Sequence, residues 1–320
     1  MKRFVGTLAA LVLTAPMASA QQVKVEAAVP AYQKTSGVSG TLNSIGSDTM
    51  NNLFTLWGES FAKIYPNVKI QVEGKGSSTA PPALIAGTAQ LGPMSRAMRG
   101  TEIDQFESKF GYKPTQLRTS YDALAVYVNK DNPLEKATLA EVDGAFSKSR
   151  RRGGKNVGTW GQLGLTGDWA ARPISLYGRN SASGTYGFFK EHALGTGDYK
   201  DTVKEQPGSA SVVQGVTADR FGMGYSGIGY KTSGVKNLAL TDKVGGAYSS
   251  GSYEDVVSGK YPLARFLYVY VNKAPGKEMD PVVREFLKFV FSKEGQEIVV
   301  KDGYYPLPAK VVAEELAKLK

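Results

Sequence analysis

Four short segments rich in glycine, serine and threonine contain most of the groups in this chain that could do chemistry. They are residues 46–49, 76–79, 92–96 and 178–185. Three of them lead into segments with a helical pattern, where unpaired backbone N–H groups and the helix dipole attract anions. Arg96 and Arg179 stand among them, and a guanidinium can form bidentate hydrogen bonds to an oxyanion. Together these parts predict a cage for a small tetrahedral oxyanion.

The cage would be built from hydroxyls, backbone amides and two guanidinium groups. A helix is expected after residue 49, a second one opened by Pro81, and a third over residues 186–194. Glycine at the start of the third helix would allow close backbone approach. The predicted ligand groups belong to Ser47, Asp48, Thr49, Ser77, Ser78, Ser95, Arg96, Arg179, Ser183, Gly184 and Thr185.

No matching set of groups for breaking a bond is present. The chain has a single histidine, His192, and no cysteine. His192 is expected near the end of a helix as a partly exposed structural side chain, and the usual zinc arrangements are excluded. Residues 222–227 match the dinucleotide pattern G-x-G-x-x-G, but residues 225–230 resemble a strand or turn where that motif needs a helix. We therefore expect no catalytic residue, no metal site and no cofactor.

The elements that must position these segments alternate between strand and helix patterns, which indicates an α/β fold. Apolar residues recur with helical spacing over residues 53–64, Pro66 stops that helix, and residues 68–72 alternate as in a strand. Asp280 followed by a proline predicts the start of a last helix that runs towards Gly303.

A repeated pentapeptide bears on domain organisation. Val-Tyr-Val-Asn-Lys occurs at residues 126–130 and again at 269–273, each time at the end of a β-rich run. Two similar strands suit a chain that crosses between domains twice. We expect a leader at residues 1–20, an extended segment at 21–39, a first domain of residues 40–121 plus 264–320, and a second domain of 122–263. The ligand would lie in the cleft between them.

The first 20 residues have the pattern of a secretory signal peptide. Lys2 and Arg3 precede an apolar run over residues 4–13, and Ala18-Ser19-Ala20 forms a small-residue cleavage site. A periplasmic protein without disulfides is therefore predicted. The formal net charge of +10 would steer anions towards it. Nucleic acid is not expected as a partner, and the basic residues 148–155 indicate an exposed loop.

As an ordered set, the four segments resemble the periplasmic phosphate-binding proteins of phosphate-specific ABC transporters. The resemblance extends from about Gly40 onward and includes residues 224–230, which are similar to a strand of that family. It implies a type II periplasmic-binding-protein fold, in which two domains, each a mixed sheet flanked by helices, close on inorganic phosphate. It also implies a monomer that delivers phosphate to an inner-membrane ABC permease without doing chemistry.

Three positions depart from the family pattern. Members of the family carry an aspartate, which accepts the proton of hydrogen phosphate, where this chain has Arg96. They also carry an acid where this chain has Ser181, whereas Asp48 stands where many relatives have threonine. Our hypothesis is that Asp48 has taken over the acceptor role and that Arg96 adds a second cation. If Asp48 instead only pairs with Arg96, selectivity for phosphate over sulfate would be weaker.

The sequence leaves three other functions open. The same cage could serve a receptor for sulfate or molybdate. A phosphatase would need a nucleophile with a base or a metal cluster, and neither is evident in the sequence. A surface adhesin could use the loop at residues 148–155.

Overall fold

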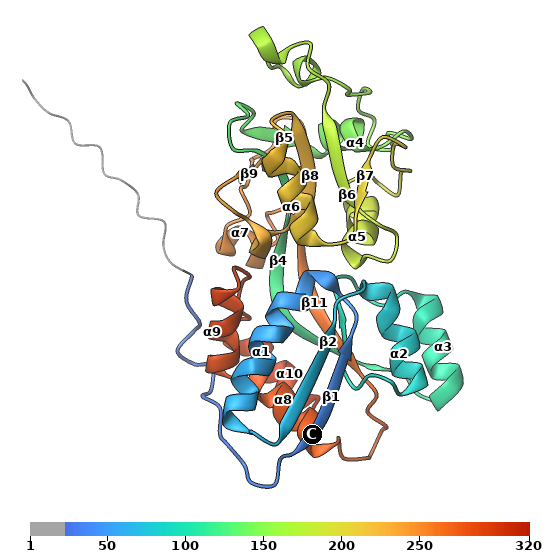
Figure 1. The fold of residues 1–320 in the computed structure, drawn as a ribbon, viewed down its shortest axis with the longest axis vertical. Helices are drawn as coiled ribbons and strands as arrows, with labels where there is room; N and C mark the ends of the chain where they lie inside the picture. Colours follow the sequence, from blue (N-terminus) through green and yellow to red (C-terminus); the bar gives the residue numbers. More distant parts are fainter. Residues whose placement is uncertain (1–22) are drawn as a thin grey trace, which may run out of the picture.

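The computed structural model describes residues 23–320, so the predicted signal peptide lies outside the described residues. Figure 1 shows two lobes, one above the other, joined by two strands that run between them. Among residues 23–320, no helix is both long and apolar enough to span a membrane.

The first lobe contains both ends of the described chain. Strands β1 (Gly40–Ile45) and β2 (Val68–Glu73) pair in parallel, and α1 (Asn51–Ile64) connects them. The rest of the lobe consists of β3 (Gly92–Met94) and the helices α2 (Ala80–Ala86), α3 (Gly100–Phe110), α8 (Pro281–Val290), α9 (Lys293–Lys301) and α10 (Ala309–Ala317).

The second lobe is the continuous middle of the chain. Its strands are β5 (Lys136–Thr138), β6 (Ser175–Arg179), β7 (Lys204–Gln206), β8 (Gly222–Gly227), β9 (Val235–Asn237) and β10 (Ala239–Thr241). Its helices are α4 (Leu139–Phe146), α5 (Gly184–His192), α6 (Ser209–Ala218) and α7 (Tyr253–Val257). The glycine-rich residues that match a dinucleotide motif form β8, a fully buried strand, and a 3-10 turn of three residues (Ile228–Tyr230) follows it instead of the α-helix that the motif requires.

The lobes are joined by the long strand β4 (Thr115–Asn129) and by β11 (Ala264–Val271), which pair antiparallel. They lie at the centre of a sheet with the order β3-β11-β4-β8-β6-β7. The repeated pentapeptide marks the far end of each crossing strand. Val126 pairs with Tyr225 of the second lobe, whereas Val269 pairs with Pro93 of the first. The two copies therefore run from the crossing into opposite lobes.

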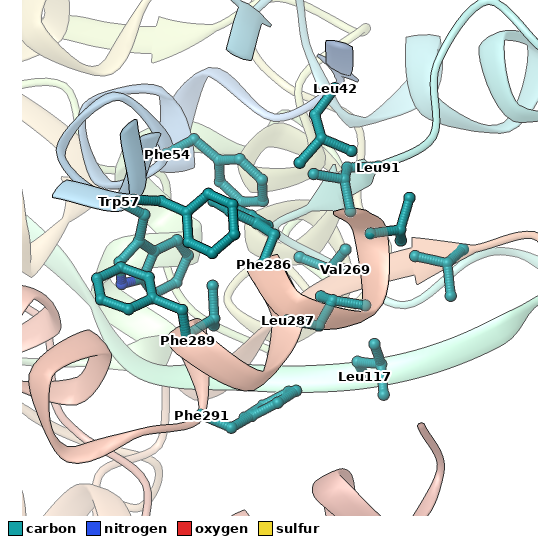
Figure 2. Close-up of a cluster of buried hydrophobic side chains, with 14 of the residues drawn as sticks. Leu42, Phe54, Trp57, Leu91, Leu117, Val269, Phe286, Leu287, Phe289 and Phe291 are labelled. Carbon is teal, nitrogen blue, oxygen red and sulfur yellow. The ribbon is translucent and has the colours of Figure 1, made fainter. Parts of the chain in front are cut away.

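Buried apolar side chains form a separate large cluster in each lobe. Figure 2 shows the cluster of the first lobe, where α1 and α8 contribute rings such as Phe54, Trp57 and Phe286. The cluster of the second lobe lies within residues 123–263, and Tyr121 packs against both. The division into residues 40–121 plus 264–320 and residues 122–263 stays a prediction, which this separation of cores supports.

Most of the predicted helices and strands are present, with two differences. The last predicted helix is broken after Val290, because the Ser292 hydroxyl caps a new helix by accepting from the Gly295 N–H at 3.2 Å. Position 295 needs glycine here, since a Cβ would lie 2.1 Å from the Phe289 carbonyl oxygen. The second difference concerns the N-terminal segment. Its described part lacks helix and strand, as expected of an extended piece, but it is not merely a lead-in, because Val29 and Val38 are buried in the core of the first lobe.

Candidate anion-binding site

One hydroxyl from each of the four segments meets the others where the lobes touch. The Thr49 and Thr185 hydroxyl oxygens are 2.8 Å apart, and Ser95 Oγ lies 3.4 Å from Thr185 Oγ1 and 3.3 Å from Ser77 Oγ. All four side chains are buried. Thr185 belongs to the second lobe and the other three to the first, so this hydroxyl cluster spans the cleft.

Helix starts and glycines bring the hydroxyl cluster together. Ser183 caps α5, its hydroxyl accepting from the Tyr186 N–H at 3.3 Å, and the helix begins at Gly184 and Thr185, so Thr185 of the cluster lies in its first turn, where backbone amides lack partners within the helix. Gly184 follows the cap, and a Cβ there would lie 2.2 Å from Ser77 Oγ. Gly76 has φ +114° and lies against the Ala182 carbonyl of the other lobe. Close approach of the two lobes therefore depends on these glycines.

Arg179 ends β6, is only 1% exposed and pairs with Asp48, the residue before Thr49 of the hydroxyl cluster. Its Nη1 donates to Ser209 Oγ at 2.7 Å, and its Nη2 lies 3.2 Å from Asp48 Oδ2. That carboxylate oxygen also accepts from the Ser209 N–H at 2.8 Å. Burial lowers the pKa of Arg179 and Asp48 opposes the shift, but a guanidinium is basic enough to stay charged.

Arg96 lies at the edge of the site, and its charge is paired. Its two terminal nitrogens donate to Glu102 at 2.7 and 2.6 Å, and Nη2 also donates to Ser78 Oγ at 3.2 Å. Although burial raises the pKa of the Glu102 carboxyl, the hydrogen bonds from Arg96 and from the Arg99 backbone lower it overall. Asp48 thus pairs with Arg179 in this structure, while Arg96 pairs with Glu102.

The structure adds site residues that the sequence pattern did not single out. Ser209 begins α6 and touches both Arg179 and Asp48, and the Tyr225 hydroxyl accepts from the Arg179 N–H at 3.1 Å. Arg265 donates from Nη2 to Thr185 Oγ1 at 3.0 Å and pairs with Asp122. In the sequence, this pair could have been suspected only because one acidic and one basic residue, Asp122 and Arg265, lie in the two strands that cross between the lobes.

Three buried polar atoms of the predicted site residues have no hydrogen-bond partner among the described residues: Ser47 Oγ, Arg96 Nε and Arg179 Nε. Buried polar groups are nearly always paired, so such atoms call for a ligand or ordered water. The surrounding groups are hydroxyls, helix-start amides and one guanidinium, which suits an anion with several acceptor oxygens. The carboxylate of Asp48 is the exception, since it can only accept unless protonated.

His192, the one histidine, is the last residue of α5 and is partly exposed. Burial lowers its pKa. Its position agrees with the structural role expected for it. The basic residues 148–155 follow α4 as a mostly exposed loop, in which Arg152 pairs with Asp242.

Comparisons with known proteins agree on one group. A family model described as a PBP superfamily domain matches residues 31–294. The phosphate-binding protein PstS of Pseudomonas aeruginosa is 57% identical over 296 residues, which cover 92% of each chain. PstS of Bacillus subtilis is 27% identical over 275 residues, covering 84% of this chain and 81% of its own.

Solved structures give the same result for the fold. A putative phosphate ABC transporter substrate-binding protein with bound phosphate from Clostridium perfringens aligns with a TM-score of 0.71 and 21% identity. The alignment covers 84% of this chain and 100% of that one. A possible phosphate-binding protein from Planctomyces limnophilus aligns with a TM-score of 0.64 and 26% identity, covering 88% and 98% of the two chains.

Proposed function

This chain belongs to the PBP superfamily and to the PstS phosphate-binding proteins within it, and from that premise we infer that it is a receptor for inorganic phosphate. It binds phosphate for uptake by an ABC transporter and is not an enzyme. The predicted α/β fold, the two-domain type II periplasmic-binding-protein fold with mixed sheets flanked by helices, is confirmed.

The observation that carries this function is the convergence of donors from both lobes on one buried place beside Arg179. The hydroxyls of Thr49, Ser77 and Ser95 come from one lobe, and Thr185 with the α5 amides comes from the other. A phosphate at that place would accept from both lobes at once and would satisfy buried donors that otherwise lack partners. Binding would thereby hold the lobes closed.

We propose that the phosphate ligands are the residues predicted from the sequence: Ser47, Asp48, Thr49, Ser77, Ser78, Ser95, Arg96, Arg179, Ser183, Gly184 and Thr185. The geometry supports unequal roles for the two arginines. Arg179 pairs with Asp48, a predicted ligand that precedes Thr49 of the hydroxyl cluster. The charge of Arg96 is instead offset by Glu102, so Arg96 would act mainly by holding Ser78.

Asp48 is proposed to select phosphate over sulfate. Both contacts of its carboxylate, to Arg179 and to the Ser209 N–H, use Oδ2, so Oδ1 can accept the proton of hydrogen phosphate. Sulfate has no such proton and would face a carboxylate that repels it. This asymmetry favours phosphate over sulfate or molybdate as the ligand.

Location and assembly are part of the same proposal. A signal peptide over residues 1–20 would export the chain to the periplasm, where the receptor would work as a soluble monomer. Its partner there would be the inner-membrane ABC permease, which receives phosphate when the lobes open.

The function can be tested by following thermal unfolding with and without phosphate. Phosphate at about 1,000 times its Kd would stabilise the wild type by about 4 kcal/mol. Arg179→Met should abolish this stabilisation, because the buried charge that faces the anion is lost. Arg172→Met, at an exposed arginine of the same lobe, serves as the control and should respond like the wild type. An Arg179→Met variant with the full wild-type shift would contradict the proposal.

A further inference from the structure

A buried ion pair lies where the chain crosses between the lobes. Asp122 of β4 and Arg265 of β11 are direct partners in the antiparallel register. Arg265 Nε and Nη2 both donate to Asp122 Oδ2, at 2.8 and 2.6 Å. Asp122 is 0% exposed and Arg265 is 6% exposed. Buried charges are costly unless they are paired, so the hydrogen bonds around this pair should matter.

The ion pair contacts both lobes. On the side of the first lobe, Arg265 Nη1 donates to the Ser95 carbonyl at 2.8 Å. On the side of the second lobe, Nη2 donates to Thr185 Oγ1 at 3.0 Å, and Asp122 Oδ1 accepts from the Ile228 N–H at 2.9 Å. The guanidinium also stands over the Phe188 ring of α5, 5.2 Å from its centre. One side chain thus joins β4, the residue that follows β3, and the start of α5.

The contact with Thr185 fixes the direction of a proton. A guanidinium has donors only, so the Thr185 hydroxyl must accept from it with a lone pair. The hydroxyl hydrogen then has to point elsewhere, and the neighbouring oxygens are those of Thr49 and Ser95 in the hydroxyl cluster. Thr185 is thereby prepared as a donor towards the centre of the site before any anion arrives, which reduces the ordering that binding requires.

We propose that Arg265 is a positioning residue of the phosphate site, which orients the Thr185 hydroxyl and the Ser95 backbone without contacting phosphate itself. This role rests on the proposed phosphate-binding function. Lysine cannot replace it, since its point-like ammonium lacks the planar fork that reaches Asp122, Ser95 and Thr185 together.

A double-mutant cycle tests whether Arg265 acts through Thr185. Phosphate binding would be measured by calorimetry for the wild type, Arg265→Lys, Thr185→Val and the double variant. Arg265→Lys should raise the Kd about tenfold in the wild-type background, the size expected for a lost charge-assisted hydrogen bond. In the Thr185→Val background the same substitution should raise it only about twofold, because the hydroxyl it orients is gone.

Arg118→Lys is the matched control. Arg118 also lies on β4 and pairs with the buried Glu315, but the hydrogen bonds of its side chain go to Glu314 and Glu315 and to no residue of the hydroxyl cluster. The Arg118→Lys substitution should lower the melting temperature and leave the phosphate Kd unchanged. If Arg265→Lys raised the Kd by the same factor in the wild-type and Thr185→Val backgrounds, the proposal would be overturned. The effect would then come from a general loss of stability and not from the Thr185 hydroxyl.

Asp122→Asn keeps the role of Arg265 testable if Arg265→Lys does not fold. The amide oxygen can still accept a hydrogen bond, but the counter-charge that orients the guanidinium is lost. Its effect on the Kd should likewise shrink in the Thr185→Val background, and an undiminished effect would count against the proposal. A wild type that binds no phosphate at all would instead refute the receptor function.

Discussion

Replacing Gly184 with alanine places a methyl group where the two lobes meet. Gly184 is the first residue of α5, and a Cβ on it would lie 2.2 Å from Ser77 Oγ and 2.7 Å from Ser95 Oγ. Both serines are buried and belong to the opposite lobe. The clash therefore exists only when the lobes are closed.

The size of the effect follows from the displacement that the methyl group requires. Relief of the contact with Ser77 needs the lobes to move apart by about 1 Å. The 2.8 Å contact between the Thr49 and Thr185 hydroxyls would then no longer be a hydrogen bond, and an anion could not reach donors of both lobes. Loss of two hydrogen bonds to a charged ligand amounts to about 3 kcal/mol or more, which is roughly a 100-fold increase in Kd.

Calorimetry with phosphate would measure this increase, and thermal unfolding without phosphate would show that the fold is intact. Alanine is the better helix former, so the unliganded melting temperature should not fall. Gly187→Ala is the control on the same helix, because its Cβ would meet only ordinary contacts, the nearest being Arg96 Cδ at 3.4 Å. A Gly184→Ala variant whose Kd stays within about threefold of the wild type would refute closure of the lobes as the basis of binding.

Three further substitutions test separate parts of the site and of the fold. Asp48→Asn should lower the calorimetric preference for phosphate over sulfate by about tenfold, and an unchanged preference would remove Asp48 from the acceptor role. Ser47→Ala should raise the phosphate Kd about tenfold yet change the unfolding free energy by less than about 0.5 kcal/mol, since its buried hydroxyl has no partner among residues 23–320. Burial raises the pKa of Asp302 to about 7 from an ordinary 3.8. Between these two pH values the folded state holds a proton that the unfolded chain has lost, so the free energy of unfolding falls as the pH rises from about 4 to about 7. Asp302→Asn should therefore unfold at a higher denaturant concentration than the wild type at pH 8 but not below pH 4, and a pH-independent difference would contradict this assignment.

Local sequence signals predicted much of the scaffold. Helical spacing and Pro66 placed α1 and its end, and a proline at residue 81 opened α2 as expected. Asp280 caps α8, accepting from the Val282 N–H at 2.9 Å. Each of these signals acts within a few residues, so no knowledge of the tertiary fold is needed to interpret it.

Contacts between distant segments could not be predicted in the same way. Glu102 is only six residues from Arg96, but their pairing depends on how the start of α3 turns back towards β3. The link from Arg265 to Thr185 depends on the register between the two crossing strands and on the position of α5 against them. The break before Ser292 is a different case, because the Ser292 cap is a local signal that the prediction of one continuous helix overlooked.

The central claim is that this chain is a phosphate receptor, and calorimetric titration of the purified wild type with phosphate and with sulfate tests it most directly. We predict saturable binding of phosphate at a single site with a Kd on the order of micromolar or tighter. Sulfate at the same ionic strength should bind at least about 10-fold more weakly, because it cannot donate to Asp48. Absence of phosphate binding, or binding of sulfate as tight as that of phosphate, would contradict the claim.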